Sequence, residues 1–568
     1  MRGAAPSLRA KPRWRLRNPR AQGSGIPGYP PILAQVLAAR GITTREAAQR
    51  FYRPHEAPTY DPYLLPGMRE AVARVKRALE ERELIGLYGD FDVDGVTSLA
   101  VLTIGLRALG AQVTRYIPDR FREGYGVNAG AIQRLHRRGV SLIITADCGI
   151  TSVKEIELAA RLGIDVIVLD HHTVPDVLPP AVANIDPKRS DSPYPFDELA
   201  AVGVAYRFLG ALYEELGREL PETELIDLVA LGTVVDVAPL VDENRAIVTK
   251  GLELMERGLR PGLEALGAAA GTRGGPNAEV FGFQWGPRLN AAGRIAHARL
   301  ALDLLLCERP SQAAALAEEL DRLNRRRQEL TDEALAAALE QLEGRDPPLL
   351  LVGGPGFHPG VVGIVAGRLA ELFNRPAIVY AEEEGLARGS ARSVPGFDVV
   401  RALRSASHLL VKFGGHRAAA GFTARVEDLE QLRDALESYA AELLDGRDRR
   451  PVLYVDAAAR LSDLGGKQLR GLLRFEPCGF GNEAPVLLSR GVRLLEVRPV
   501  GSDGQHLRLR LRDGAVTWDA IAFGQGEAEL AEAVDVVYSL ACDPLRDRVE
   551  LRVLDIAPAS ERRPLEGV

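Results

Sequence analysis

The chain has 568 residues, 46% of them apolar and 26% charged, a balance typical of a globular protein with roughly three or four domains. Its net charge of −6 excludes a uniformly basic DNA-coating protein, and no apolar run reaches the roughly 18 residues that a membrane span requires. The four cysteines are far apart and form no CxxC pair, so they predict neither a zinc site nor a disulfide framework and fit a reducing cytoplasm.

Basic residues crowd the first 22 positions, which contain seven lysines and arginines and no acid. The segment lacks the apolar core of a secretory signal. It is therefore either an arm that binds nucleic acid or a solvated tail, and we group it with the lead-in as residues 1–50.

An alternation of strands and helices predicts an α/β domain over residues 51–260. Apolar runs such as "LIGLYG" and "SLIITAD" predict strands, and "GVTSLAVLTIGLRALG" and "VKEIELAARLG" predict the helices between them. This is the βαβ pattern of a parallel sheet, in which ligands collect at the carboxyl ends of the strands. Asp90, Asp147 and Asp170 stand at three such ends.

The stretch "GDFDVDGVTS" carries three acids at alternate positions, Asp90, Asp92 and Asp94. Carboxylates this close repel one another, so we expect a cation among them. A calcium loop of the EF-hand type fails, because Val101 stands where that loop needs a glutamate and the preceding segment predicts a strand. The remaining ligands must come from elsewhere in the chain.

Three later runs supply them. "IITADCGI" contains Asp147, "VIVLDHH" contains Asp170, His171 and His172, and "VALGTVVDVAPL" contains Asp236. A lone aspartate at a strand end is more often a cap than a ligand, but we read these positions together as strand-end sites of one sheet. Carboxylates with an imidazole suit Mn²⁺, and Mg²⁺ less well. Two ions about 3.5–4 Å apart could share these carboxylates, which predicts metal-dependent phosphoester hydrolysis.

The second half predicts three more units. Residues 261–345 form a linker that ends in one long helix over 309–343, whose "RLNRRRQ" patch is either a nucleic-acid contact or, preferably, a solvated face. Residues 346–446 resume the α/β alternation. Residues 447–560 predict a small β-barrel, because Leu507, Leu509 and Leu511 alternate with Arg508, Arg510 and Arg512 before a "DG" turn.

Several runs resemble a known superfamily. "DFDVDGVTS", "TADCG", "LDHH" and "GTVVDVAPL" are similar to the four motifs of the DHH phosphoesterases, and "GFHPGVVGIVAGRLAE" and "GGHRAAAGF" resemble their associated DHHA1 domain. "GPRLNAAGR" and "EPCGFGNEAPV" narrow the resemblance to the RecJ family of bacterial exonucleases, over about residues 30–558. The resemblance implies two α/β lobes joined by a long helix and followed by an OB-fold.

The same resemblance implies an activity and ligands for it. We expect a Mn²⁺- or Mg²⁺-dependent exonuclease of DNA recombination and repair that degrades single-stranded DNA from 5′ to 3′ into nucleoside monophosphates. The metal ligands carried over are Asp92, Asp94, Asp147, His171 and Asp236, with Asp90 a further ligand or an acceptor behind the ligands. His172 is expected to orient or protonate at the phosphate. Asp170 either holds a histidine by a hydrogen bond or caps a strand end.

The resemblance also selects residues along the path of the substrate. In each case an ordinary surface or packing role is the alternative. The candidates for binding phosphate or base are Arg120, Arg122, Tyr125, Arg288, Asn290, Arg294, His358, Ser390, Arg392, Gly415 and His416. The arginine row of the barrel would extend the single-strand groove, or else keeps an edge strand soluble.

Two other functions remain open. A small-substrate phosphoesterase shares the metal motifs but typically lacks the long connector and the barrel. A catalytically dead replication scaffold would have lost metal ligands, which this chain retains. By resemblance we also expect a cytoplasmic monomer whose partners are the 5′ end of single-stranded DNA, a single-strand-binding protein and a helicase.

Overall fold

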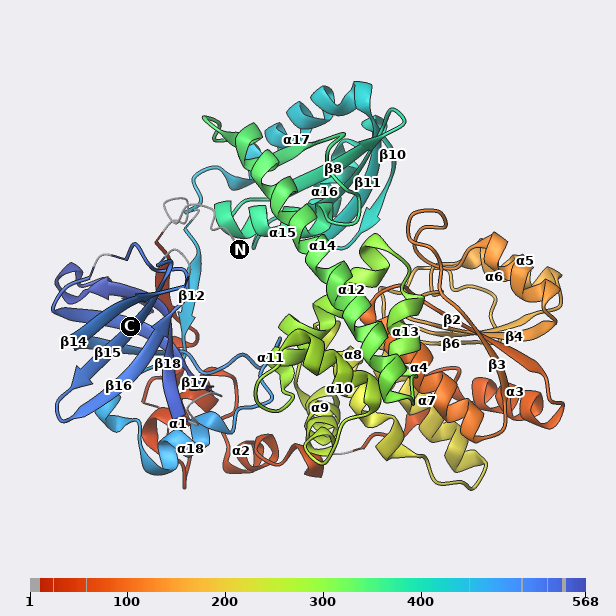
Figure 1. The fold of residues 1–568 in the computed structure, drawn as a ribbon, viewed down its shortest axis with the longest axis horizontal. Helices are drawn as coiled ribbons and strands as arrows, with labels where there is room; N and C mark the ends of the chain where they lie inside the picture. Colours follow the sequence, from red (N-terminus) through yellow and green to blue (C-terminus); the bar gives the residue numbers. More distant parts are fainter. Residues whose placement is uncertain are drawn as a thin grey trace.

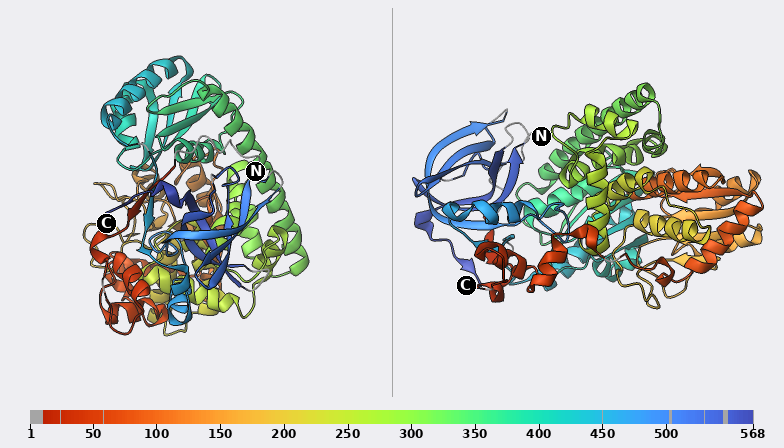
Figure 2. Two further views of the ribbon diagram at one scale, coloured as in Figure 1. Left: turned by 90° about the vertical axis from the view of Figure 1, so that its left-hand side faces the viewer. Right: turned by 90° about the horizontal axis from the view of Figure 1, so that it is seen from below.

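The computed structural model describes residues 11–23, 25–57, 59–448, 450–501, 504–528, 530–543 and 548–567. Two α/β lobes and a β-barrel make up the molecule, and one long helix runs between the lobes (Figure 1). Figure 2 shows the barrel as a separate body beside the helical part of the first lobe. In the described part of the chain, no helix is both long enough and apolar enough to cross a bilayer.

The first lobe is built on a five-stranded parallel sheet, which confirms the βαβ prediction. Its strand order is β3-β2-β4-β5-β6, and its apolar strands are buried on both faces, as the covered faces of a parallel sheet require. The strands are β2 (Leu84–Gly89), β3 (Gln112–Tyr116), β4 (Val140–Ala146), β5 (Asp165–Leu169) and β6 (Ala183–Ile185).

Helices cover both faces of this sheet because alternate strand residues point to opposite sides. Leu142 and Ile144 pack with α3 (Met68–Glu80), α4 (Val93–Ala108) and α7 (Ala201–Glu215). Ile143 packs on the other face with α5 (Ala129–Arg137) and α6 (Val153–Arg161).

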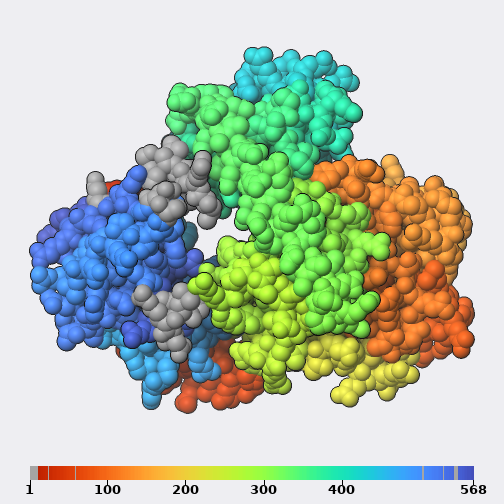
Figure 3. Space-filling model, viewed as in Figure 1, coloured from red at the N-terminus to blue at the C-terminus, as the bar shows by residue number. Residues whose placement is uncertain are grey.

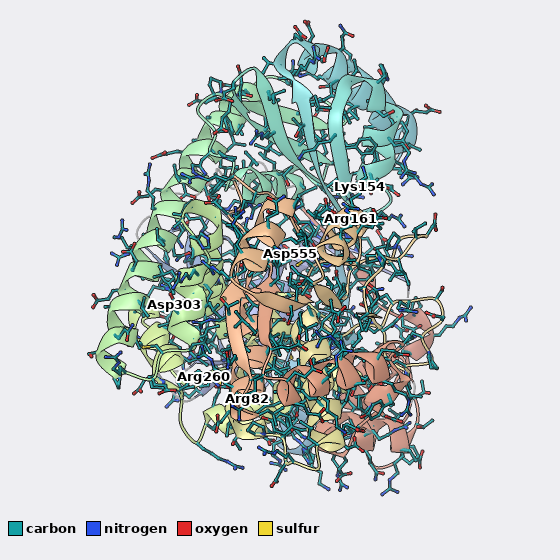
Figure 4. All side chains as sticks on the ribbon, turned by 90° about the vertical axis from the view of Figure 1, so that its right-hand side faces the viewer. Arg82, Lys154, Arg161, Arg260, Asp303 and Asp555 are labelled. Atoms are coloured by element: carbon teal, nitrogen blue, oxygen red, sulfur yellow. The ribbon has the colours of Figure 1, made fainter. Side chains whose placement is uncertain are left out.

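A group of helices follows the sheet. They are α8 (Ile226–Val235), α9 (Asp242–Met255), α10 (Pro261–Ala270), α11 (Ala278–Val280), the π-helix η6 (Phe281–Trp285), α12 (Gly286–Ile295) and α13 (Arg299–Leu305). Arg260, labelled in Figure 4, ties the start of α10 to α8 through an ion pair with Asp227 at 2.6 Å between Nη2 and Oδ1.

The long connector is confirmed as α14 (Pro310–Leu342), whose 33 residues span about 50 Å. Its first half buries Ala313, Ala317 and Leu320 in the core of the first lobe. Its last turns bury Ala338 and Leu342 in the core of the second lobe. One helix therefore fixes the two lobes relative to each other.

The second lobe carries a mixed sheet with strand order β10-β11-β9-β8-β7, in which only β7 and β8 are parallel. The strands are β7 (Leu350–Gly354), β8 (Ala377–Glu383), β9 (Leu386–Arg392), β10 (Leu410–Gly415) and β11 (Ala419–Arg425). The helices are α15 (Val362–Phe373), α16 (Val399–Ser405) and α17 (Leu429–Leu444).

The barrel closes through pairing of β14 with both β15 and β17. Leu507, Leu509 and Leu511 are at most 3% exposed, so the predicted inward face of the hairpin is confirmed. The strands are β13 (Ala457–Ala458), β14 (Leu487–Val500), β15 (His506–Asp513), β16 (Val516–Ala522), β17 (Ala533–Asp543) and β18 (Arg548–Pro558).

The N-terminal segment corrects the expectation of a solvated tail or free arm. Residues 1–10 lie outside the described residues, but β1 (Arg13–Leu16) pairs with β12 (Val452–Val455) and β19 (Leu565–Glu566). Trp14 is fully buried and donates from Nε1 to Asp555 Oδ2 at 2.7 Å. The helix α1 (Pro31–Ala39) packs Leu33 and Leu37 into the barrel core. Because the segment is so basic, its alternation of arginine with the apolar Trp14 and Leu16, which are buried, was not recognised as a strand.

The barrel is joined to the first lobe through one buried arginine. Arg245 of α9 donates to the carbonyls of Phe475 and Pro477 at 3.0 Å and of Glu476 at 2.9 Å. Burial lowers the pKa of Arg245 to about 10, which leaves it charged at neutral pH. A second contact joins Arg552 of β18 to Glu279 of α11 at 2.8 Å. Between barrel and linker helices the surface is hollowed (Figure 3).

We expect Arg245→Ala to loosen the segment 475–483, because three buried carbonyls lose a charged donor. A loss of about 3 kcal/mol of local stability is the expected size. Hydrogen–deuterium exchange of amides in 475–483 should then accelerate about a hundredfold. Arg257→Ala, an exposed arginine just after the same helix, is the control. Equal exchange in both variants would contradict the assignment.

Candidate metal centre

Five carboxylates and two histidines meet at the carboxyl edge of the first sheet. Three overlapping groups have ligand atoms within 4.8 Å of one another. The groups are Asp90, Asp92 and Asp147; Asp94, His171 and Asp236; and Asp147, His171 and His172. The sequence prediction that these distant runs supply one cluster is consistent with this geometry.

Two helix N-termini hold the acids of the "DFDVDG" stretch. Asp92 caps α4, since its Oδ1 accepts from the N–H groups of Asp94 at 3.0 Å and Gly95 at 3.2 Å. Asp94 accepts from Ala201 and Val202 at the start of α7 at 2.7 and 2.9 Å. The positive end of a helix dipole stabilises a nearby carboxylate. The acids are therefore fixed before any cation binds.

His171 lies at the middle of the cluster. Its Nε2 is 3.2 Å from Asp147 Oδ1 and 3.7 Å from Asp94 Oδ2, and its Nδ1 is 3.7 Å from Asp236 Oδ2. The buried Nε2 makes no hydrogen bond to any described residue, and neither does buried Asp90 Oδ1. Buried polar atoms are normally satisfied. Nitrogen and oxygen atoms that lack a hydrogen-bond partner and lie among carboxylates fit a site for divalent cations.

Electrostatics support the same conclusion. Burial, reinforced by the charge of Asp92, raises the pKa of Asp94 to about 7. Burial and neighbouring aspartates also raise the pKa values of Asp90, Asp147 and Asp236 well above their usual range. Burial, followed by the charge of His172, lowers the pKa of His171 to about 3, which keeps its imidazole neutral and able to bind a metal.

Asp147 occupies the left-handed region with φ of +64°, which non-glycine residues rarely adopt outside functional sites. Strand pairing continues through it, because its N–H donates to Leu169 O at 3.0 Å. The unusual backbone directs the carboxylate toward His171. Asp147 belongs to two of the three ligand groups.

Asp170 makes the hydrogen bond to a histidine that the sequence predicted. Its Oδ1 accepts from His172 Nδ1 at 2.7 Å and from the His171 N–H at 2.8 Å, and its Oδ2 accepts from Ile150 N–H at 3.0 Å. Although burial opposes ionisation, the His172 bond holds the pKa of Asp170 below its ordinary value. Against the opposing effect of burial, the same bond raises the pKa of His172.

Asp236 corrects the sequence analysis, because it does not follow a strand. It caps the C-terminus of α8. An apolar run such as "VALGTVV" does not distinguish a buried strand from a helix that is buried all round, and α8 is of the second kind. The residue still reaches the cluster.

Three predicted phosphate ligands form an arginine cluster beside Asp90 and Asp92. Arg120 lies over the Phe91 ring at 4.8 Å. Burial, followed by the charges of Arg120 and Arg327, lowers the pKa of Arg294 to about 10. Arg392 donates from Nη1 to Ser390 Oγ at 2.9 Å, and burial lowers its pKa. Mutually repelling, half-buried cations fit an anion site.

Arg327 of α14 is a neighbour of this cluster that was not predicted, because a solvated face was favoured for "RLNRRRQ". The position of Arg327 in the helical repeat could have revealed it. Arg327 lies seven residues after buried Leu320 and four before buried Thr331, so it points inward while Arg325 and Arg326 are exposed.

Other predicted contacts lie apart from the arginine cluster. Arg288 donates from Nε to Asp321 Oδ1 at 2.9 Å, so its guanidinium is engaged inside the protein. Arg122 is exposed on its loop. Asn290 accepts from the Val93 N–H at 3.2 Å and so supports the start of α4. Tyr125 places its hydroxyl 3.2 Å from His172 Nε2.

The second lobe reaches the centre through His416 and reaches the neighbouring loop of the first lobe through His358. His416 Nδ1 lies 3.2 Å from Thr173 Oγ1, and its ring stacks 6.4 Å from that of His172. It follows Gly415, where a Cβ would lie 2.5 Å from Ala419 O. His358 packs edge-on against Phe121 at 5.8 Å. Both lobes therefore border the cluster.

The comparisons with known proteins agree with this architecture. Family models match the DHH family N-terminal domain over residues 84–233, the DHHA1 domain over 346–442 and the RecJ OB domain over 455–555. The chain is 36% identical to the single-stranded-DNA-specific exonuclease RecJ of Dickeya dadantii, over 92% of this chain and 95% of that protein. It is 43% identical to the RecJ of Bacillus subtilis over 88% of this chain, but spans only 64% of that relative's length.

Solved structures give the same result. The Mn²⁺ complex of RecJ from Thermus thermophilus matches with a TM-score of 0.81 and 34% identity, over 96% of this chain and 80% of that one. The Mg²⁺ complex from the same organism matches with a TM-score of 0.75 and 33% identity, over 96% and 78%.

The metal-free protein should lose stability as pH rises from about 4 to 7. Asp94 has an ordinary pKa of 3.8 and a pKa of about 7 in the fold, so the unfolded chain releases its proton first and rising pH favours unfolding. Mn²⁺ should bind more tightly over the same range, because protons and cation compete. Thermal unfolding with chelator and with Mn²⁺ across this range measures both effects.

Asp94→Asn should flatten the pH dependence in the chelator series, whereas Asp434→Asn, at an exposed acid of the second lobe, should leave it intact. If the stability of the metal-free protein stayed constant between pH 4 and 7, the carboxylates of the cluster would not repel one another.

Proposed function

Since the chain belongs to the RecJ family of DHH phosphoesterases, we propose that it is a metal-dependent exonuclease that degrades single-stranded DNA from the 5′ end into nucleoside monophosphates. The observation that carries the proposal is the pairing of a buried carboxylate–histidine cluster with an adjacent arginine cluster, both bordered by the second lobe.

Two divalent cations, Mn²⁺ in preference to Mg²⁺, are the proposed cofactors. Asp90, Asp92, Asp94, Asp147, His171 and Asp236 would hold them. Asp147 belongs to two of the ligand groups, which supports its place among these ligands. Bound there, the cations would activate water and offset charge on the phosphoryl oxygens.

The chain's own residues position the phosphate. His172, oriented by Asp170 through the 2.7 Å bond and with its pKa raised, can donate a proton or hydrogen bond to a phosphoryl oxygen. His416 stacks beside it from the second lobe and can contact the neighbouring phosphate. Tyr125 lies beside His172, with its hydroxyl 3.2 Å from the His172 Nε2.

Direction requires recognition of a strand end, because every phosphodiester offers similar oxygens to the cations. The arginine cluster supports a pocket for the 5′ phosphate, made by Arg120, Arg294, Ser390 and Arg392. A planar guanidinium can hold phosphate oxygens in a bidentate manner. Such a pocket would select a terminus and exclude a continuing strand.

The connector and barrel favour this function over a small-substrate phosphoesterase. A dinucleotidase needs neither a separate OB domain nor outward arginines such as Arg510, which is exposed on β15. OB-folds commonly bind single strands. We place the protein in the cytoplasm, as the wide spacing of its four cysteines supports, and propose a monomer that works beside a single-strand-binding protein and a helicase, by family resemblance.

Asp147→Asn should abolish nucleotide release from 5′-labelled single strands while the fold is retained. Asparagine is chosen over alanine because it tolerates the positive φ of this position. With Mn²⁺ or Mg²⁺ the wild type should release labelled mononucleotides from long single strands far faster than from blunt duplexes or dinucleotides. Near-normal turnover of the variant, with unchanged circular dichroism, would exclude Asp147 from the centre. Preference of the wild type for dinucleotides would replace the proposed function by the small-substrate alternative.

Arg392→Ala should slow digestion of 5′-phosphorylated strands by about ten- to a hundredfold, the loss expected for a charge-assisted contact of about 1.5–3 kcal/mol. The preference for 5′-phosphate over 5′-hydroxyl ends should narrow by the same factor, as matched oligonucleotides measure. Arg404→Ala, at an exposed arginine of α16, is the control. An unchanged phosphate-to-hydroxyl ratio in Arg392→Ala would remove this residue from the pocket.

A further inference from the structure

We propose that Phe480 is the side chain on which the nucleobase following the cleaved phosphate stacks, so that it positions the 3′ side of the strand at the metal centre. This inference rests on the proposed function and adds to it the site at which the strand leaves the centre.

The location of the ring is the first observation. A cavity of about 330 Å³ borders the metal cluster and is lined by His171 and Asp236 from the first lobe, His416 from the second and Phe480 from the segment before the barrel. Lys188 and Glu198 line the same cavity. The Phe480 ring offers a surface for the face of a base, and the Lys188 ammonium offers a counter-charge for a phosphate.

The exposure of the ring is the second observation. Phe480 is 59% exposed, so the protein gives up most of the stabilisation that burying a phenylalanine side chain would contribute. Within the described residues, no aromatic ring or guanidinium packs on it. Other exposed aromatic residues occur in the described chain, but of these only Phe480 lines this cavity.

The segment that carries the ring is nevertheless fixed. The Phe480 carbonyl accepts from the Leu240 N–H at 2.7 Å, and Gly479 and Asn482 exchange backbone bonds at 3.0 and 3.1 Å. Gly481 has φ of +73°, and a Cβ there would lie 2.8 Å from Pro239 Cβ. These backbone contacts therefore hold the segment against residues 239–240, and the ring is positioned without being buried. A preorganised aromatic surface binds a base at low entropic cost.

The two sides of the metal cluster give the direction. The arginine cluster lies by Asp90 and Asp92, where Arg120 covers Phe91. The cavity with Phe480 lies by His171 and Asp236. A strand whose terminal phosphate occupies the arginine cluster and whose next phosphate meets the metals must continue across this cavity. Stacking tolerates every base, which suits an enzyme that digests without sequence preference.

The test compares Phe480→Ala and Phe480→Trp on 5′-phosphorylated strands. Phe480→Ala should raise KM about five- to a hundredfold with little change in kcat, the range found when a stacking residue is truncated, and Phe480→Trp should retain the wild-type KM.

A second set of strands locates the stacked base. Each of these strands carries a single abasic site at one of the first few positions after the 5′ nucleotide. The rise in KM caused by Phe480→Ala should disappear when the abasic site is at one of these positions, because no base is then left to stack.

Tyr454→Ala, at an exposed aromatic of β12 that does not line the cavity, should leave KM unchanged. An unchanged KM for Phe480→Ala, or a penalty that is equal at every abasic position, would overturn the proposal. Failure of the proposed function is distinguishable, because the wild type would then fail to release mononucleotides from the unmodified strand.

Discussion

The mutual repulsion of buried carboxylates is the constraint on which the centre depends. Asp90, Asp94, Asp147 and Asp236 sit too close together, and too deeply, for all to ionise without a cation. The fold imposes this arrangement with fixed groups: two helix N-termini hold Asp92 and Asp94, and strand pairing holds Asp147 at positive φ. Divalent cations held among these carboxylates would relieve the repulsion that remains, and the scaffold would thereby set the affinity for metal.

The rest of the molecule surrounds this centre with rigid walls. The connector α14 is shared by the cores of both lobes, so the second lobe presents His416 beside His172 at a set distance. Arg245 does the same for the barrel by binding three consecutive carbonyls. Without these contacts, the residues that border the centre would come from bodies free to move apart, and a phosphate could not be held by all of them together.

Much of this could be predicted from the sequence because it is local. The βαβ alternation, the long helix and the Leu–Arg alternation of β15 each follow from periodicity within one segment, and the acids at the ends of β2, β4 and β5 follow from the sheet. What the sequence did not reveal depended on tertiary partners. The run before Asp236 is helical because other helices bury it on all sides, Trp14 lies on a strand that pairs with β12 and β19, and Arg288 pairs with Asp321, 33 residues away.

The asymmetry of the centre bears on the direction in which a strand would be digested. A metal cluster alone treats both directions of a strand alike, but here its two sides differ chemically. On one side lie the half-buried guanidinium groups of Arg120 and Arg294, which form no ion pair within 4 Å among the described residues and suit a terminal phosphate with its extra charge. On the other lies a cavity lined by Lys188, Phe480 and Glu198 among others, where a cation and an aromatic ring are available to a continuing strand. Under the proposed function, a strand end would occupy the first side and the continuing chain the second, and the polarity of digestion would follow from this chemical difference.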